Sequence, residues 1–234
     1  MLQKLNLINR LTSNQKRFFA ELLGTFVIVV FATGSVVLDV RYAGKFGLWF
    51  VALAPAVAVA LMVYLFAKIS MAHFNPAVTV GFLITRHTPR HLFPLYLGAE
   101  IIGAILGSLF VKYIIGADAN LGANAPDYHY PIPLIIGVEV LATALLMSMI
   151  LLVVHKKGFR GFGSIMIGCM VGLDIFFLAF VSGASMNPAR SLAPALVSGY
   201  VNDLWLYWTA TFVGSSIAAV SYRFLTHNIG HTGK

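Results

Sequence analysis

The stretch Ser-Gly-Ala-Ser-Met-Asn-Pro-Ala-Arg, residues 182–190, places a polar turn inside an otherwise apolar run. The first half of the chain repeats its Asn-Pro-Ala triplet in His-Phe-Asn-Pro-Ala-Val, residues 73–78, again between long hydrophobic segments. Asn is a favoured N-cap, and Pro is tolerated at the first helical position because the N–H that it lacks has no partner there. Each triplet therefore predicts the start of a helix.

Neither predicted helix is long enough to cross a bilayer, which takes about 20 residues. The first covers about residues 75–84 and the second about residues 187–197. In a membrane sequence, two such segments suggest half-helices that meet inside the bilayer and carry partial positive charge and unpaired N–H groups to mid-depth. Irregular backbone at that depth needs protein or a water-filled cavity around it, so the pattern predicts a pore.

The composition is that of an integral membrane protein. Of 234 residues, 59% are hydrophobic and only 10% are charged, whereas soluble domains carry about 25% charged residues. The net charge of +8 does not indicate a nucleic-acid partner, because the basic residues form no patch. Twelve of the 16 Lys and Arg fall on one predicted side, with Arg41, Lys45, Lys112 and Arg190 elsewhere. By the positive-inside rule, both termini are expected in the cytoplasm, which requires an even number of spans.

The two halves of the chain share one order of segments. Each half has a helix with Glu-x-x-x-Thr, a second helix, an Asn-Pro-Ala half-helix and a third helix. Because each half contains three spans, the second enters the membrane from the opposite side, an inverted arrangement that builds sites at the midplane. We expect one channel domain over residues 1–234, with a cytoplasmic leader at 1–15, repeat one at about 16–115, repeat two at about 134–226, and spans at about 16–38, 48–69, 92–115, 134–154, 162–181 and 204–225.

These motifs together resemble the aquaporin, or major intrinsic protein, family over essentially residues 16–226. The doubled triplet, the six spans, the Arg directly after the second triplet and the repeated Glu-x-x-x-Thr carry the resemblance. It implies an all-α membrane protein with six transmembrane helices, two re-entrant half-helices and inverted three-helix repeats. It also implies a passive channel with no enzyme activity and no cofactor, a homotetramer with one pore per subunit, and a location in the plasma membrane.

The resemblance places the asparagines of both triplets in the pore. A passing water would offer its oxygen to both amides, which turns its hydrogens outward and breaks a proton relay, while the helix N-termini repel cations. The alternative is that both asparagines serve only as N-caps. The motif residues are Asn75, Pro76, Ala77, Asn187, Pro188 and Ala189.

The resemblance assigns a selectivity filter to Pro55, Ile175, Ala184 and Arg190. Water-selective relatives have Phe and His at the first two positions. Without them the filter is expected to be wider and apolar on most sides, which favours water together with glycerol, urea or ammonia. Arg190 is expected to donate hydrogen bonds to the solute and to repel cations, because a charge inside a membrane protein is usually functional. The alternative for Arg190 is a salt bridge to Asp203.

Other positions favour a strictly water-selective channel. Glycerol facilitators typically have Asp after the motif Arg and a basic residue four positions later, where this chain has Ser191 and Ala195. The pair Tyr207-Trp208 also resembles the aromatic pair of water channels. Strict water selectivity therefore stays open as the alternative to a broader pore.

Several further polar residues lie in or beside the spans. The resemblance has Glu21 and Glu139 accept hydrogen bonds from the re-entrant loops, with a proton relay as the alternative. A carboxylate facing lipid costs roughly 2 to 3 kcal/mol or more, so Asp174 is expected to face protein, the pore or a subunit interface. Glu100 predicts an interhelical hydrogen bond. His73 is expected at the cytoplasmic mouth, either lining the pore or packing in the loop.

Two functions of other classes are alternatives to a channel. A proton-coupled secondary transporter also uses inverted repeats and broken helices, and Glu21, Glu100, Glu139 and Asp174 are candidate proton carriers. A non-conducting junction protein would need a long adhesive loop, which the sequence lacks. No His/Cys cluster predicts a metal site, and the single cysteine, Cys169, is expected to pack in an apolar segment.

Overall fold

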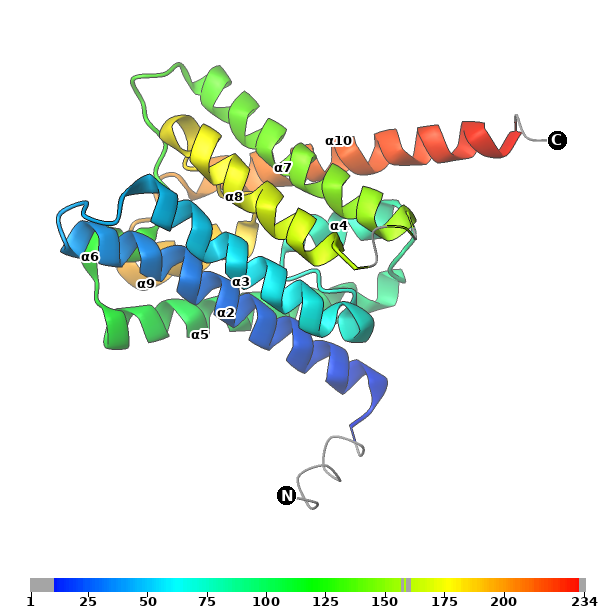
Figure 1. Ribbon diagram of the computed structural model, residues 1–234, viewed down its shortest axis with the longest axis horizontal. Coiled ribbons are helices and arrows are strands. Elements are labelled where there is room, and N and C mark those ends of the chain that lie inside the picture. The colour runs from blue at the N-terminus through cyan, green and yellow to red at the C-terminus, as the bar shows by residue number, and fades with distance from the viewer. Residues whose placement is uncertain (1–10, 157, 159–160, 232–234) are drawn as a thin grey trace.

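The computed structural model describes residues 11–156, 158 and 161–231, which form a bundle of helices (Figure 1). In this part of the chain, six long helices run along the bundle and two half-helices meet inside it. A 3-10 turn, η1 (Arg90–Leu92), precedes α5, and a π-helical turn, η2 (Val111–Ile115), follows it. The long helices are α2 (Ser13–Arg41), α3 (Gly47–Ser70), α5 (Phe93–Phe110), α7 (Ile132–His155), α8 (Gly163–Ser182) and α10 (Leu204–His231), and the half-helices are α4 (Pro76–Ile84) and α9 (Pro188–Ser198).

The predicted order of helices and half-helices is confirmed, and the differences lie at the helix ends. Helix α10 continues to His231, beyond its predicted end near Leu225. Asp39, predicted to begin a loop, lies inside α2 and accepts hydrogen bonds from Phe46 N (3.0 Å) and Gly47 N (2.8 Å). Pro55 lies inside α3, and the helix is continuous through it although proline has no N–H to donate there.

The two halves of the chain interleave. In the first half α2 packs against α3 and α5, and in the second half α7 packs against α8 and α10. Helices α3 and α8 join the two sets. Each half-helix also packs against a long helix of the other half, α4 against α10 and α9 against α5. The half-helices are therefore held by both repeats at once.

Glycines allow α5 and α2 to approach closely. A Cβ atom at Gly103 of α5 would collide with Leu22 O of α2, and one at Gly107 would lie 2.9 Å from Phe26 O. Small residues at such contacts let helix backbones pack closely in membranes, where lipid offers no hydrophobic driving force between helices. Gly98, on the same helix, differs from these two glycines, because a Cβ atom there meets nothing within 4 Å.

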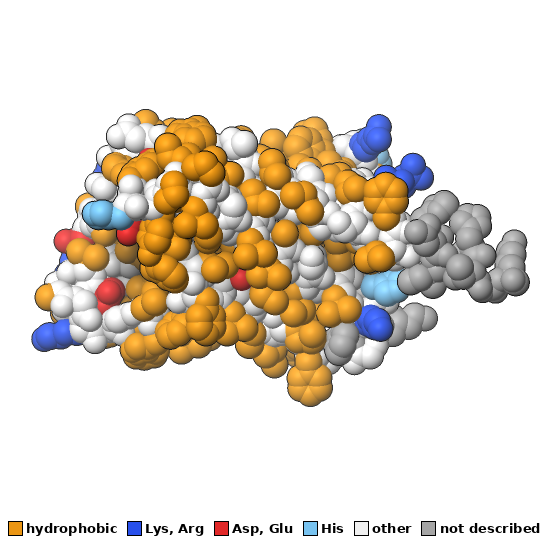
Figure 2. All heavy atoms as spheres, turned by 90° about the horizontal axis from the view of Figure 1, so that it is seen from above, with side chains coloured by type: hydrophobic (Ala, Val, Ile, Leu, Met, Phe, Trp, Pro, Cys, Tyr) orange, Lys and Arg blue, Asp and Glu red, His pale blue; other side chains and the backbone are white. Residues whose placement is uncertain are grey.

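The outside of the bundle is apolar. Helices α2, α3, α7 and α8, and α5 with its flanking turns, are long and apolar enough to cross a membrane. Many large apolar side chains on them are exposed, such as Phe31 (45%) and Phe177 (59%). Figure 2 shows the hydrophobic side chains as a band across the middle of one face of the molecule. An exterior of this kind is suited to lipid rather than water.

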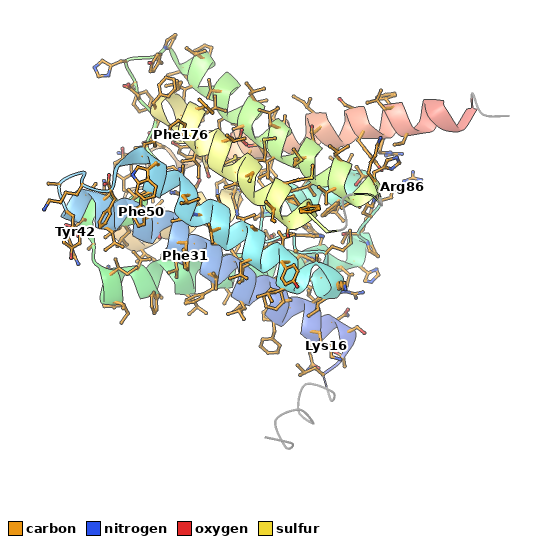
Figure 3. The ribbon with its side chains drawn as sticks, in the orientation of Figure 1. Lys16, Phe31, Tyr42, Phe50, Arg86 and Phe176 are labelled. Carbon is orange, nitrogen blue, oxygen red and sulfur yellow. The ribbon has the colours of Figure 1, made fainter. Side chains whose placement is uncertain are left out.

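Charged side chains gather at the two ends of the bundle. The start of α2 and the end of α10 lie toward the same end of the bundle (Figure 1), which we call the terminal face, and Lys and Arg gather there on the visible side of Figure 2. Arg86, in the turn after α4, lies at this end, and Tyr42, after α2, lies at the other end, which we call the opposite face (Figure 3). An apolar band between two polar ends is the arrangement of a protein that spans a bilayer.

Candidate functional site

Each half-helix begins with an asparagine cap. Asn75 has an extended backbone, and its Oδ1 atom accepts a hydrogen bond from Ala77 N at 2.9 Å. Asn187 accepts from Ala189 N at 3.0 Å and from Arg190 N at 3.3 Å. A proline follows in both cases and occupies the first helical position, where no N–H is needed. Helices α4 and α9 thus begin where the two triplets predict.

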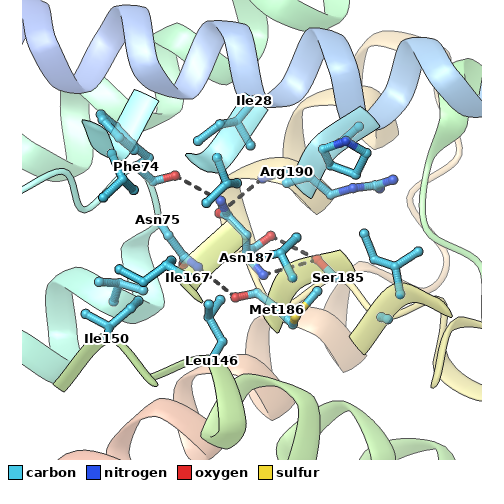
Figure 4. Close-up of a pocket in the computed structure, with 18 of the residues that line it drawn as sticks. Ile28, Phe74, Asn75, Leu146, Ile150, Ile167, Ser185, Met186, Asn187 and Arg190 are labelled. Carbon is cyan, nitrogen blue, oxygen red and sulfur yellow. Dashed lines mark hydrogen bonds between the residues drawn. The ribbon is translucent and has the colours of Figure 1, made fainter. Parts of the chain in front are cut away.

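The same two asparagines link the half-helices to each other. Asn75 Nδ2 donates to Met186 O at 2.7 Å, and Asn187 Nδ2 donates to Phe74 O at 2.9 Å (Figure 4). A primary amide carries two N–H groups, so each asparagine keeps one donor after this exchange. Both asparagines line one cavity. A solute in this cavity can therefore meet two amide donors at the junction of the half-helices.

A buried carboxylate supports the first re-entrant loop. Glu21 of α2 is fully buried and accepts hydrogen bonds from His73 N (3.0 Å) and Phe74 N (2.6 Å). Phe74 has a φ of +53°, a left-handed conformation that ends any regular helical hydrogen bonding in the loop. Glu21 therefore satisfies backbone donors that would otherwise be unpaired away from water.

Glu139 of α7 occupies the equivalent position beside the second loop. It is fully buried and accepts hydrogen bonds from Met186 N (2.6 Å), Ser185 N (3.2 Å) and Ser182 Oγ (2.9 Å). Met186, like Phe74, has a positive φ, of +56°. The two carboxylates thus make the contacts with the re-entrant loops that the resemblance implies.

The cavity between the two loops has a volume of about 320 Å³. It extends from residues near the terminal face, such as Ala67 and Val153, to residues near the opposite face, such as Asn124 and Ala125. Most of its wall is apolar, and Figure 4 shows this wall around the paired asparagines. The apolar residues that line it include Ile28, Ala32, Val51, Val59, Val63, Val78, Leu146, Ile150, Ile167 and Val171.

All four residues of the predicted filter line this cavity. Pro55 comes from α3, Ile175 from α8, and Ala184 and Arg190 from the second re-entrant loop and α9. Phe50, an aromatic residue that precedes Pro55 in α3, does not line the cavity and so does not replace Pro55 in the filter. Three of these four residues are therefore apolar, and Arg190 contributes the charge.

Arg190 is bound by a residue that the sequence analysis did not predict. Its NH1 atom donates a hydrogen bond to Asn124 Oδ1. Among the described residues Arg190 makes no salt bridge. Asp203, the predicted alternative partner, instead accepts from the hydroxyls of Tyr128 and Tyr200, and the hydrogen bond to Asp203 raises the pKa of Tyr128 to about 12. No motif marks Asn124, because its role depends on how the loop folds.

His73 both packs in its loop and contributes to the cavity wall. Its ring stacks on Tyr96, with ring centroids 4.1 Å apart, and its Nδ1 and Nε2 atoms lie 2.8 Å from Thr79 Oγ1 and 3.3 Å from Thr88 Oγ1. The Thr79 hydroxyl donates to Glu100 Oε1 at 2.6 Å. Since its one hydrogen is used there, Thr79 must accept from His73, which places the proton of the neutral ring on Nδ1.

The two remaining acids differ in their surroundings. The Thr79 contact links Glu100 of α5 to α4, the interhelical hydrogen bond expected from the sequence. Asp174 of α8 is 3% exposed and does not line the cavity. Its Oδ2 atom has no hydrogen bond to the described residues. The side chain of Asp174 therefore faces protein rather than the pore.

Comparison with known proteins agrees with this architecture. The profile of the family described as major intrinsic protein matches residues 9–222. The chain is 33% identical to "Aquaporin NIP3-1" of Arabidopsis thaliana, over 90% of this chain and 67% of that protein, and 34% identical to "Aquaporin TIP4-4" of Zea mays, over 87% and 83%. Its fold is similar to the X-ray structure of the aquaglyceroporin from Plasmodium falciparum, with a TM-score of 0.77, 24% identity, and coverage of 89% of this chain and 95% of that one. The chain therefore belongs to the major intrinsic protein family of membrane channels.

Proposed function

We propose that this channel passes water and also small neutral solutes such as glycerol, urea and ammonia, while it excludes protons and ions. The observation that carries the proposal is the composition of the cavity wall at Pro55, Ile175, Ala184 and Arg190. Neither a Phe ring nor a His donor stands at the first two positions. A solute with one polar edge and an apolar body can face Arg190 and the three apolar sides together.

Exclusion of protons follows from the junction of the half-helices. A water between Asn75 and Asn187 accepts from the two amide N–H groups that remain after their hydrogen bonds to the loops. Its own hydrogens then point toward its two neighbours along the cavity, so it cannot pass a proton on. The N-termini of α4 and α9 add positive potential at the same place, and Arg190 adds a full charge.

The contacts of the buried acids favour a passive channel over a proton-coupled transporter. Glu21 and Glu139 are occupied by backbone donors of the re-entrant loops. Asp174 does not line the cavity. None of the four candidate acids lines the cavity, so none is placed to bind a proton and contact a solute in turn.

The uneven distribution of Lys and Arg between the two ends of the bundle supports one orientation in the membrane. The terminal face carries most Lys and Arg, and the positive-inside rule places it in the cytoplasm. In this orientation the filter lies toward the outside of a plasma membrane and the turn after α4 toward the cytoplasm.

Stopped-flow light scattering on proteoliposomes tests the proposed function. The protein should accelerate shrinkage after an osmotic shock with an impermeant solute, relative to protein-free vesicles, and should also accelerate influx of glycerol and urea from isosmotic gradients. Influx should not depend on a pH gradient. Fast water flow without solute influx would instead establish a strictly water-selective channel, as Ser191, Ala195 and Tyr207-Trp208 suggest.

A further inference from the structure

Asn124 joins three segments around the charged side of the cavity. It is 8% exposed and follows the short left-handed turn α6 (Asp118–Gly122). Its Oδ1 atom accepts from Arg190 NH1 and from Ser191 Oγ (3.0 Å), and its Nδ2 atom donates to Gly183 O (2.9 Å). One amide thus connects its own loop to the start of the second re-entrant loop and to the first turn of α9.

The chemistry of the partners fixes the orientation and the charge of this group. Guanidinium nitrogens only donate and a carbonyl only accepts, so the amide oxygen of Asn124 must face Arg190 and its nitrogen must face Gly183. A guanidinium has five N–H groups, and the side-chain hydrogen bonds of Arg190 to described residues use one nitrogen. Because Asn is neutral, this contact holds the guanidinium without cancelling its positive charge.

The loop that carries Asn124 is itself anchored at several points. Asp127 N donates to Val181 O at 3.0 Å, which ties the loop to the end of α8. Gly122 has a φ of +63°, and a Cβ atom there would lie 2.7 Å from Thr33 O of α2. Arg41 pairs with Asp118 at 3.0 Å. Asn124 is therefore presented to Arg190 from a firm support on both α2 and α8.

We propose that Asn124 is a positioning and specificity-determining residue of the filter, which fixes the direction of the Arg190 donors and leaves the charge of Arg190 in force. The inference rests on the proposed function, because it concerns the same filter. It assigns to Asn124 two separable effects, one on the shape of the passage and one on the exclusion of cations.

Asn124→Asp tests the charge, because it keeps an acceptor for Arg190, but it also removes the donor to Gly183 O. The carboxylate has the same shape and can still accept from Arg190, so the ratio of glycerol to water permeability should stay within about twofold of the wild type. The new negative charge pairs with the guanidinium and cancels it. We expect K⁺ permeability, measured by a diffusion-potential dye in proteoliposomes at low salt, to rise about tenfold or more. A charge-assisted hydrogen bond contributes enough free energy to change an equilibrium by about that factor, so loss of the repulsion from Arg190 should have an effect of this size.

Asn124→Ala isolates the position. Arg190 loses its side-chain partner and can move into the cavity, which is the open space beside it. A displaced Arg190 side chain should hinder glycerol more than the smaller water molecule, so the ratio of glycerol to water permeability should fall by roughly threefold or more. K⁺ exclusion should persist, because the charge of Arg190 remains. A merely structural role for Asn124 would not produce this opposite pattern in the two variants.

Ser191→Ala is the matched control, because it removes the other hydrogen bond to Asn124 Oδ1, together with the contact to Ser185 Oγ, and keeps the Arg190 contact. It should behave like the wild type in both assays. A rise in K⁺ permeability and a fall in the glycerol-to-water permeability ratio in Ser191→Ala, as large as those in the Asn124 variants, would overturn the inference. Wild-type values in both Asn124 variants would also overturn it, with the proposed function intact. The K⁺ assay of Asn124→Asp needs no solute passage, so it decides the inference even for a strictly water-selective protein. A wild type that conducts neither water nor solutes would instead contradict the proposed function.

Discussion

The asparagines of the two triplets show how one side chain serves three contacts. In each, the oxygen caps its own half-helix, one amide hydrogen binds a carbonyl of the other loop, and one hydrogen remains for the cavity. The sequence predicts the cap, because Asn before Pro is a strong start signal. The exchange with Phe74 O and Met186 O was not predictable, because both residues adopt left-handed conformations that only the folded loops impose.

Substitution of Asn187 by Asp tests this arrangement at a single atom. The carboxylate can still cap α9, but it loses the donor to Phe74 O and places a negative charge where two helix N-termini meet. We expect K⁺ permeability of proteoliposomes to rise about tenfold or more, with a smaller change in water permeability. Asn120→Asp adds the same charge at an exposed position outside the cavity and should have no effect. Equal ion exclusion in Asn187→Asp and the wild type would argue against this geometry.

A histidine in the turn after α4 makes stability depend on pH. Burial lowers the pKa of His87, and the nearby His155 lowers it further. The Nδ1 atom of His87 lies 2.8 Å from Thr85 Oγ1, and the ring of Tyr222 packs near both histidines. Below the ordinary pKa of about 6.5, the unfolded chain therefore binds the proton of His87 more tightly than the folded chain does. Stability is thus lost as the pH falls through this range.

The melting temperature in detergent, measured at about pH 7.5 and about pH 5.5, checks this dependence. The wild type should lose more stability on acidification than His87→Gln, which has no group to titrate there. His91→Gln, an exposed histidine near the same turn, is the control and should follow the wild type. An identical loss in all three proteins would show that His87 does not contribute.

At the scale of elements, the close packing of α5 on α2 predicts different effects of alanine at two glycines of α5. Gly103→Ala should destabilise the protein by about 1 to 3 kcal/mol, because the new Cβ atom collides with Leu22 O, a backbone atom that cannot rotate away. Gly98→Ala should be neutral or stabilise by up to about 1 kcal/mol, because its Cβ atom meets open space and Ala favours helix. Thermal unfolding in detergent measures both, and equal effects of the two variants would contradict this packing.

The helices and half-helices could be predicted because long apolar segments and cap residues mark them locally. The connection between α5 and α7 could not. Ala119, Asn120 and Leu121 form a left-handed turn that packs on α2, and no local pattern indicates that conformation. Asn124 follows this turn, so its contact with Arg190 was also missed. The family resemblance assigned Pro55, Ile175, Ala184 and Arg190 to the filter, and the folded chain brings all four to one cavity.

At the scale of the whole molecule, the two repeats are tied to each other at the centre of the bundle. Helix α4 packs on α10, α9 packs on α5, and the asparagine exchange joins the two loops. Transporters with inverted repeats move one repeat against the other around a fixed site. Such a movement would here break contacts made by both half-helices. The interleaved packing therefore fits a channel, in which the solute moves and the protein keeps one arrangement.

The central claim is that the apolar filter sets the range of solutes, and the glycerol-to-water permeability ratio of Pro55→Phe combined with Ile175→His tests it most directly. The ring and the imidazole should narrow the passage, so the ratio should fall about tenfold or more while water still flows. Val57→Phe adds the same ring on the exposed side of α3 and should leave the ratio unchanged. A ratio in the double variant equal to that of the wild type would contradict the account, because the filter would then lie elsewhere.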